Sequence, residues 1–187
     1  MDYNKYRGLT LYQAFSKNAK ESADEPCTIF KNKVFKYEYV AFRIEQTAHL
    51  LKKHGACGGG DIITIVLPNI PQTEYIIYGA NKIGAIVHLI HPLSTKEQLI
   101  DNITKTGSNY IFVLDRFASN YFEVLKDKKI KIFTVSPFGE LGLFKNFIYK
   151  RISRIKSHPE VIDFDSELRL CKVFEKANCA EKDAKET

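Results

Sequence analysis

The apolar positions along this chain alternate between the spacing of a helix and the spacing of a strand. A helix is predicted from Glu38 to Gly55, because apolar residues three or four positions apart form one face and the glycine can end the helix. These residues are Val40, Ile44, Ala48 and Leu51. Residues 62–67 then form an apolar run, which is the pattern of a strand covered on both sides in a parallel sheet.

The same alternation continues downstream of this strand. Gly84 and Gly107 each follow an amphipathic stretch and are predicted to end a helix. Ser94 and Glu97 have the spacing of a capping box, which predicts a helix start there. The predicted elements are a helix at 72–83, a strand at 86–90, the capped helix ending at 107, a strand at 110–114, a helix at 118–126 and a strand at 130–135.

Strands joined by helical crossovers are expected to be parallel and to be connected right-handedly. Residues 28–37 instead predict a hairpin that turns at Asn32 and Lys33. The predicted fold class is therefore α/β, with a mainly parallel sheet flanked by helices. We expect an N-terminal helix and lead-in at 1–27, a core α/β subdomain at 28–136, and a third part at 137–187. That last part combines a basic amphipathic helix with a partly disordered C-terminal segment.

Composition agrees with an ordered domain. The chain has 187 residues, of which 44% are hydrophobic and 27% charged, and no apolar run approaches the roughly 18 residues of a membrane span. The N-terminus does not have the basic and then apolar pattern of a secretory signal, so a cytoplasmic location is expected. The cysteines lack the pairing of a zinc site or a disulfide scaffold and are expected to be reduced thiols. They are Cys27, Cys57, Cys171 and Cys179.

The net charge of +6 has a local origin. Five basic residues follow one another without an acidic residue among them: Lys145, Lys150, Arg151, Arg154 and Lys156. Apolar residues of the same segment are predicted to lie along the opposite side of the helix: Phe144, Phe147, Ile148, Ile152 and Ile155. A solvated surface is the preferred interpretation of the charge. Weak contact with a membrane surface, or with an acyl substrate, is the next, and no nucleic-acid partner is expected.

Gly58-Gly59-Gly60 has the composition of a phosphate-binding loop. A phosphate loop follows a strand and opens a helix, so that free backbone N–H groups meet the anion. Here the predicted order is helix, glycines, strand. The glycines are therefore interpreted as a turn that leads into the strand, with Asp61 at its edge.

Two loops are predicted at the carboxyl ends of parallel strands, where open α/β sheets bind ligands. One is Pro68-Asn69-Ile70-Pro71 and the other is His91-Pro92-Leu93. Ser94 is interpreted as a helix cap and not as a nucleophile. The remaining histidines have no carboxylate or cysteine at the spacing of a triad or a metal site. They are His49, His54, His88 and His158. No catalytic residue and no metal ligand is therefore predicted.

The segment from Gly60 to Pro92 resembles the opening of the AMP-dependent synthetase and ligase family, the adenylate-forming enzymes that include acyl-CoA synthetases. Lys36-Tyr37-Glu38-Tyr39-Val40 and the helix closing at His54-Gly55 stand where that family has a Thr-Tyr-x-Glu-Leu element and a long helix. The resemblance covers residues 9–114. It implies the N-terminal subdomain of the large domain of such an enzyme.

The resemblance also implies a reaction. Family members join a carboxylic acid to ATP, release pyrophosphate, and pass the acyl group of the acyl-adenylate to CoA. ATP, CoA and Mg would serve the full-length protein, and none is expected to bind this piece alone. In similar CoA ligases the loop at His91, Pro92 and Leu93 runs beside the CoA nucleotide, although the family often has Asn where His91 stands.

The chain reaches Thr187 without the glycine-rich, lysine-containing loop that grips ATP in that family. We therefore expect an N-terminal fragment, truncated before the ATP-binding loop and inactive alone. It is expected to self-associate, because Tyr75, Ile76, Ile77 and Tyr78 cannot all face one sheet. The alternative is a stand-alone, non-catalytic α/β binding or interaction module. Nothing in the sequence distinguishes one carboxylic acid substrate from another.

Overall fold

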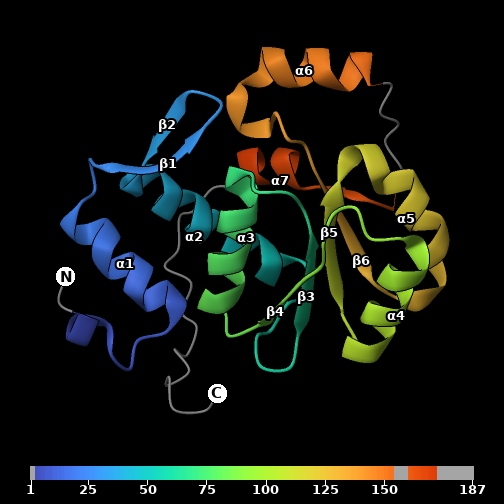
Figure 1. Cartoon of the computed structure of the whole chain (residues 1–187), viewed down its shortest axis with the longest axis horizontal. Helices are drawn as coiled ribbons and strands as arrows, with labels where there is room; N and C mark the ends of the chain where they lie inside the picture. The colour runs from blue at the N-terminus through green and yellow to red at the C-terminus, as the bar shows by residue number, and fades with distance from the viewer. Residues whose placement is uncertain (1–2, 154–159, 172–187) are drawn as a thin grey trace.

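The computed structural model describes residues 3–153 and 160–171 (Figure 1). The strands are β1 (Pro26–Phe30), β2 (Lys33–Lys36), β3 (Ile62–Val66), β4 (Ile86–Leu89), β5 (Tyr110–Leu114), β6 (Lys131–Val135) and β7 (Ile162–Asp163). The α-helices are α1 (Leu11–Glu21), α2 (Tyr37–Lys53), α3 (Pro71–Lys82), α4 (Lys96–Thr106), α5 (Ala118–Leu125), α6 (Leu143–Ile152) and α7 (Phe164–Leu170). Single 3-10 turns are η1 (Tyr3–Tyr6), η2 (Asp115–Phe117), η3 (Lys126–Lys128) and η4 (Gly139–Leu141).

The main sheet has five strands in the order β4-β3-β5-β6-β7, and every neighbouring pair is parallel. The predicted parallel α/β sheet is therefore confirmed. β3 lies between β4 and β5, and Ile63 pairs with Val87 on one side and Tyr110 on the other. The apolar run of β3 is covered on both faces, as expected. The apolar run at 86–90 likewise predicts a strand covered on both faces, and this prediction is wrong. β4 is an edge strand and leaves Ile86 and Leu89 exposed.

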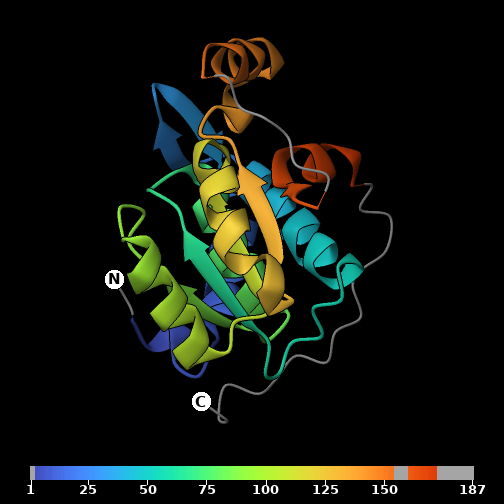
Figure 2. The ribbon, with the colours of Figure 1, turned by 90° about the vertical axis from the view of Figure 1, so that its right-hand side faces the viewer.

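Helices cover the two faces of the sheet with separate cores (Figures 1 and 2). One core lies under α2, α3 and α7 and receives Ile65, Phe112 and Phe133 from the strands. The other lies under α4 and α5 and receives Val66 and Ile111. Adjacent residues of a strand thus point to opposite cores, as the pleat of a strand requires.

The sheet extends beyond the predicted core region of 28–136. β7 and α7 were not predicted, because a strand of two residues is too short to show an alternating pattern. Phe164, at the start of α7, is fully buried and meets Phe112 edge-on, and Phe112 stacks on Phe133. α7 is therefore part of the main core.

The hairpin β1-β2 is confirmed, but its turn lies one residue earlier than predicted, at Lys31 and Asn32, both at positive φ, and Lys33 already pairs with Phe30. Tyr37 begins α2 and does not extend β2. The predicted capping box is wrong by one residue: Thr95, not Ser94, accepts a bond from the N–H of Gln98, and the Gln98 side chain accepts from the N–H of Thr95. Both residue pairs fit the same motif, and the backbone selects the second.

The packing of α3 contradicts the argument that its four consecutive apolar residues would be exposed and drive self-association. Tyr75 and Ile76 are buried, and Ile77 and Tyr78 are partly buried against the same core. Tyr78 lies 4.7 Å from Phe15 of α1, measured between ring centroids. α3 therefore contacts α1 and α2 as well as the sheet, and these helices cover most of the apolar surface of the four residues.

The helix predicted in the basic segment exists as α6, but its orientation is opposite to that of an ordinary amphipathic helix. Its apolar side faces outward, and its buried residue is the polar Asn146. Lys150 lies on the packed side and Arg151 is exposed, so the basic residues do not share one face. Ile155, Arg154, Lys156 and His158 lie outside the described residues, as does the segment 172–187 with Cys179.

Among the described residues, no helix is both long and apolar enough to cross a membrane. Cys27, Cys57 and Cys171 are free thiols. Burial, with the nearby Glu74 carboxylate, raises the pKa of Cys27 to about 11, so this thiol is a poor nucleophile near neutral pH.

Candidate functional site

The carboxyl ends of the five parallel strands meet at one edge of the sheet, on the side where α6 lies (Figure 2). This is the edge at which open α/β sheets bind ligands. The loops after β3 and β4 form one half of the edge, which we call the exposed half because Asn69, His91 and Leu93 are exposed there. Leu67 and Ile70 of the first loop are buried. The residues after β5, β6 and β7 form a half that α6, α7 and η4 cover.

The exposed half contains the predicted site residues. His91 and Leu93 are exposed and Pro92 is partly buried. The loop is a tight turn, in which the N–H of Ser94 donates to the C=O of His91 at 3.0 Å. The N–H of Leu93 donates to Nδ1 of His91 at 3.2 Å, which leaves Nε2 as the protonated and outward nitrogen of the neutral ring. The loop thus presents a donor and an apolar side chain to solvent.

The turn at Gly58-Gly59-Gly60 has no part in this edge. It precedes β3, at the opposite end of the strands, as the sequence indicated. A Cβ atom at Gly58 would lie 2.0 Å from the carbonyl oxygen of Ile83, so the glycine is required for close backbone packing. The Asp61 carboxylate accepts the N–H of Cys57 and closes the turn.

The covered half is a buried polar network centred on Asp165. One carboxylate oxygen accepts the N–H of Ser136 at 2.7 Å, and the other accepts Nε2 of Gln72 at 3.0 Å. Gln72 also donates to the C=O of Ser136, and the Ser136 hydroxyl donates to Asn146 of α6. A Cβ atom at Gly139 would lie 1.9 Å from the Asp165 carboxylate, so only glycine fits there. The network joins β6, α3, α6 and α7.

Burial dominates the electrostatics of this carboxylate. It raises the pKa of Asp165 to about 6, although the bonds from Gln72 and Ser136 act in the opposite direction. Burial likewise raises the pKa of Asp115, the residue after β5, against the bond that Tyr149 donates. For Asp163, burial acts to raise the pKa, but the Lys150 ammonium at 2.6 Å outweighs it and the pKa is lowered.

A second polar cluster joins the hairpin and α2 to η4. Glu140 is buried, and its carboxylate accepts a hydrogen bond from the Tyr39 hydroxyl at 2.5 Å. The other carboxylate oxygen lies 3.3 Å from Nε of Arg43. Lys33 of β2 donates to the C=O of Glu140. Burial, with the nearby Glu140 carboxylate, raises the pKa of Tyr39 to about 12. These contacts fix the chain leading into α6.

The arrangement does not form a catalytic constellation in the described part of the chain. The buried carboxylates bind internal donors, and no three His, Cys, Asp or Glu residues come together as metal ligands among the described residues. His88 contacts the Thr64 hydroxyl, and His54 packs edge-on against Phe133 with Glu167 at 3.5 Å. The edge can thus position loops and bind through exposed groups.

Two pockets on the described surface lie elsewhere, beside α1. One, of about 490 Å³, is lined by Tyr12 and Lys17 among others, and one, of about 320 Å³, by Phe15 and Tyr78 among others. Neither is lined by residues of the carboxyl edge.

Sequence reasoning missed the buried network. Asp115 and Ser136 are each the first polar residue after an apolar strand, and that position was a usable signal. Gln72 and Asn146 gave no such signal, because a single polar residue on a helix does not show which strand end it will bond to.

Comparison with known proteins places these features in a family. The family described as AMP-binding enzyme matches residues 15–153, a range that includes both loops of the exposed half and α6. A long-chain-fatty-acid–CoA ligase from Salmonella typhimurium is 25% identical over 176 residues, covering 90% of this chain and 31% of that protein. An acetyl-coenzyme A synthetase from Campylobacter jejuni is 30% identical over 121 residues, covering 60% of this chain and 18% of that protein.

Solved structures agree on the fold. A benzoate CoA ligase from Burkholderia xenovorans superposes with a TM-score of 0.68 at 13% identity, covering 96% of this chain and 30% of that one. The N-terminal subdomain of NpsA from Klebsiella oxytoca, in complex with anthranilyl-AMSN, gives 0.64 at 12% identity, covering 98% and 37%. This chain thus spans about a third of the length of the relatives that it matches.

Proposed function

The chain belongs to the AMP-binding enzyme family, and we propose that it forms the N-terminal part of an AMP-forming acid–CoA ligase. In the proposed reaction a carboxylic acid and ATP give an acyl-adenylate and pyrophosphate, and the CoA thiol then displaces AMP to give a thioester. Adenylation is needed because a carboxylate is a poor electrophile, whereas AMP is a good leaving group. ATP, CoA and Mg would serve the whole enzyme, and a cytoplasmic location is part of the proposal.

The observation that supports this proposal best is the extent of the match to CoA ligases. Relatives named long-chain-fatty-acid–CoA ligase align over 83–90% of this chain, whereas the acetyl-coenzyme A synthetase aligns over 60%. We therefore propose a long-chain fatty acid as the substrate. The family match also runs through α6, so the outermost helix of the described chain belongs to the shared region.

Within the proposal, the chain positions and binds but does not catalyse. The loop at His91, Pro92 and Leu93 would contact CoA, because its outward Nε2 and apolar Leu93 offer a donor and a contact surface. The buried network at Asp165 would hold the end of β6 against α3 and α7 in the other half of the same edge. The grip on ATP and the catalytic groups would come from the part of the relatives' length that this chain does not match.

The proposal is tested by assaying the protein of the complete reading frame that contains this chain. We expect pyrophosphate release that depends on a long-chain fatty acid, with acetate and benzoate as poor substrates, and thioester formation on addition of CoA. The 187-residue chain alone should give no turnover above a mock purification. Release without any acid dependence, or turnover by the chain alone, would contradict the proposal, and a reading frame that ends at Thr187 would favour the non-catalytic module.

The CoA-side loop is tested separately in the same protein. His91→Ala is expected to raise the KM for CoA about threefold to tenfold, the effect of one lost hydrogen bond, and to leave the KM for ATP unchanged. His49→Ala, in the middle of α2, is the matched control. An unchanged KM for CoA would remove this loop from the CoA site.

A further inference from the structure

The outer side of α6 is an exposed apolar face on a short helix. Its large apolar residues have exposed fractions between 38% and 76%. They are Leu143, Phe144, Phe147, Ile148 and Ile152. Single exposed apolar residues are normal on protein surfaces, but five within ten helical residues form a contiguous patch of the kind that marks an interaction surface.

The contacts on the inner side of α6 hold this face outward. Asn146 accepts the Ser136 hydroxyl, and the Tyr149 hydroxyl donates to Asp115 at 2.9 Å. Lys150 pairs with Asp163 at 2.6 Å. Rotating the helix to bury its apolar residues would break all three contacts and leave buried polar groups without partners. The outward orientation is therefore built into the fold.

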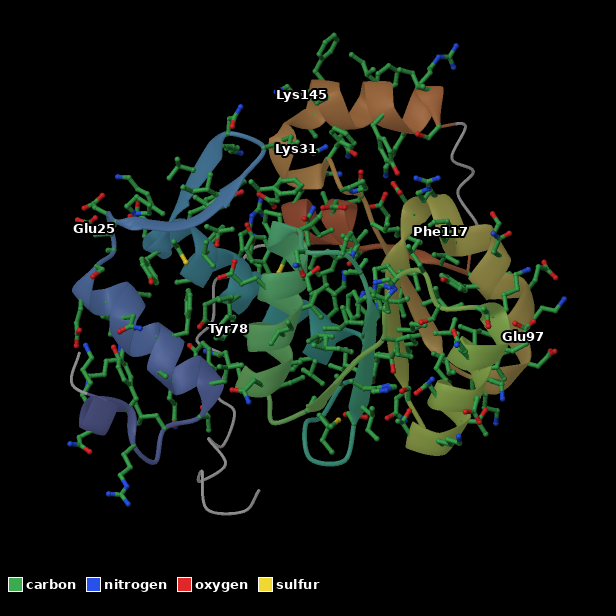
Figure 3. The ribbon with its side chains drawn as sticks, in the orientation of Figure 1. Glu25, Lys31, Tyr78, Glu97, Phe117 and Lys145 are labelled. Atoms are coloured by element: carbon green, nitrogen blue, oxygen red, sulfur yellow. The ribbon has the colours of Figure 1, made fainter. Side chains whose placement is uncertain are left out.

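The charge around the face is positive. Lys145 and Arg151 are exposed on α6. Asp163 pairs with Lys150, so the charges available to a binding partner are those of Lys145 and Arg151. No acidic residue occurs in the sequence between Glu140 and Glu160. Lys31, at the tip of the hairpin, lies near Lys145 (Figure 3), and its Nζ is 3.8 Å from the ring centroid of Phe138.

The position of α6 in the molecule suits a flat partner. The helix lies across one end of the molecule, outside the layers that enclose the sheet, and its axis runs along the surface (Figures 1 and 2). No neighbouring element reaches above it in either view. A planar surface could therefore contact the whole length of the helix.

We propose that α6 is a membrane-docking helix, which lies in the headgroup region of an anionic lipid bilayer. The apolar face would enter the boundary between headgroups and acyl chains, and Lys145, at the edge of the face, would contact lipid phosphates. Arg151 follows Phe147 by one helical turn on the same face and would extend its guanidinium group to the phosphates while its aliphatic stem stays among the apolar side chains. A second copy of this chain is a poorer partner, because packing two such faces together brings their basic residues close and like charges repel. This surface stands on the contacts of α6 alone and does not depend on the proposed ligase reaction.

The sequence offers a clean spectroscopic test, because the chain contains no tryptophan. Phe147→Trp places a single fluorophore on the apolar face, and Phe42→Trp places one at an exposed phenylalanine of α2 as the matched control. With vesicles of phosphatidylcholine and phosphatidylglycerol, the Phe147→Trp emission is expected to shift to the blue and to be quenched by brominated lipid. The control should show neither change. Emission of Phe147→Trp that is unaffected by these vesicles would overturn the proposal.

Vesicle flotation with the 187-residue chain then separates the two parts of the surface. Phe144→Ser with Phe147→Ser should reduce binding about tenfold or more, and Phe42→Ser should not. Lys145→Glu with Arg151→Glu should also reduce it about tenfold or more, and wild-type binding should weaken as salt is raised. Equal binding to pure phosphatidylcholine would overturn the electrostatic part. If the serine variant instead abolishes self-association in light scattering while vesicle binding is unchanged, the face is a contact between copies and the lipid assignment is wrong.

Discussion

Asp165 is the buried carboxyl group that joins β6, α3 and α7. It accepts the N–H of Ser136 and the amide of Gln72, and it is 4% exposed. The oxygen of the Gln72 amide is also buried and has no hydrogen-bond partner among the residues that the structure describes. Ionised Asp165 therefore lies in an environment that compensates its charge incompletely, and its titration should be visible in the stability of the protein.

The pH dependence follows from the pKa of Asp165. Its folded pKa of about 6 lies above the ordinary value of 3.8, so the folded state holds more protons between these values than the unfolded state does. Ionisation of this group therefore lowers the free energy of unfolding as pH rises from about 4 to about 6, by at most about 3 kcal/mol. The difference between wild type and Asp165→Asn, measured by urea denaturation across this range, should show that slope. Asp101→Asn, on the surface of α4, is the control for the loss of an exposed carboxylate.

Ile65 offers a residue-scale test of the sheet. Its side chain is 1% exposed in the centre of β3, so Ile65→Asp would bury an unpaired charge. We expect a loss of several kcal/mol or a failure to fold, measured by thermal melting. Lys126→Asp, at an exposed residue that pairs with Glu123, should leave the melting temperature close to that of the wild type. A soluble Ile65→Asp protein with unchanged melting would contradict the position of β3.

At the scale of elements, the sequence predicted helices and strands well where their pattern is long. β3, β5 and β6 are apolar runs, and α2 has a regular stripe, so burial alone specifies them. β7 was not predicted, because a strand of two residues is too short to show an alternating pattern of apolar and polar positions. The orientation of α6 was not predicted either, because periodicity shows that one face of a helix is apolar but not whether that face points to the core or to solvent. Polar partners distant in the sequence, Asp115, Ser136 and Asp163, decide that.

The start of α4 gives a paired test at this scale. Thr95→Ala removes the side chain that accepts the N–H of Gln98 and should cost about 1 kcal/mol. Ser94→Ala, one residue earlier, should be nearly neutral because Ser94 lies outside the capping box. Urea denaturation of the two variants measures both values. The reverse order would restore the Ser94 and Glu97 box that the sequence suggested.

Substitutions of two phenylalanines test whether α7 packs in the core and whether the apolar face of α6 lies outside it. Phe164 is fully buried against Phe112, so Phe164→Ala should cost about 3–5 kcal/mol. Phe144 is 75% exposed, so Phe144→Ala should change stability by less than about 0.5 kcal/mol. Thermal unfolding gives both values under one condition. A large cost at Phe144 would mean that α6 packs inward.

At the scale of the whole molecule, apolar surface remains open at several places among the described residues. The outer face of α6 and the edge strand β4, with Ile86 and Leu89 exposed, are two of them. An edge strand also presents unpaired backbone groups, which can bind another strand. The sequence predicted open apolar surface in this chain but placed it on α3, where α1 and α2 in fact provide cover.

We expect the purified chain to self-associate at micromolar concentration through the β4 edge, as measured by light scattering coupled to size exclusion. Ile86→Lys with Leu89→Lys should shift the protein toward the monomer, because charges on an edge strand oppose pairing. Phe42→Lys, at an exposed residue of α2, is the control and should leave the association unchanged. A monodisperse wild-type monomer that binds no hydrophobic dye would show that these surfaces do not drive association.

The strand order of the sheet bears on how the chain can fold during synthesis. β3 leaves the ribosome first, β4 then pairs with one side of it and β5 with the other, and β6 and β7 follow outward in turn. After β3, each new strand therefore meets a partner that has already been made. Assembly in order of translation shortens the time for which an apolar strand such as β3 is unpaired, and this limits misfolding of the nascent chain.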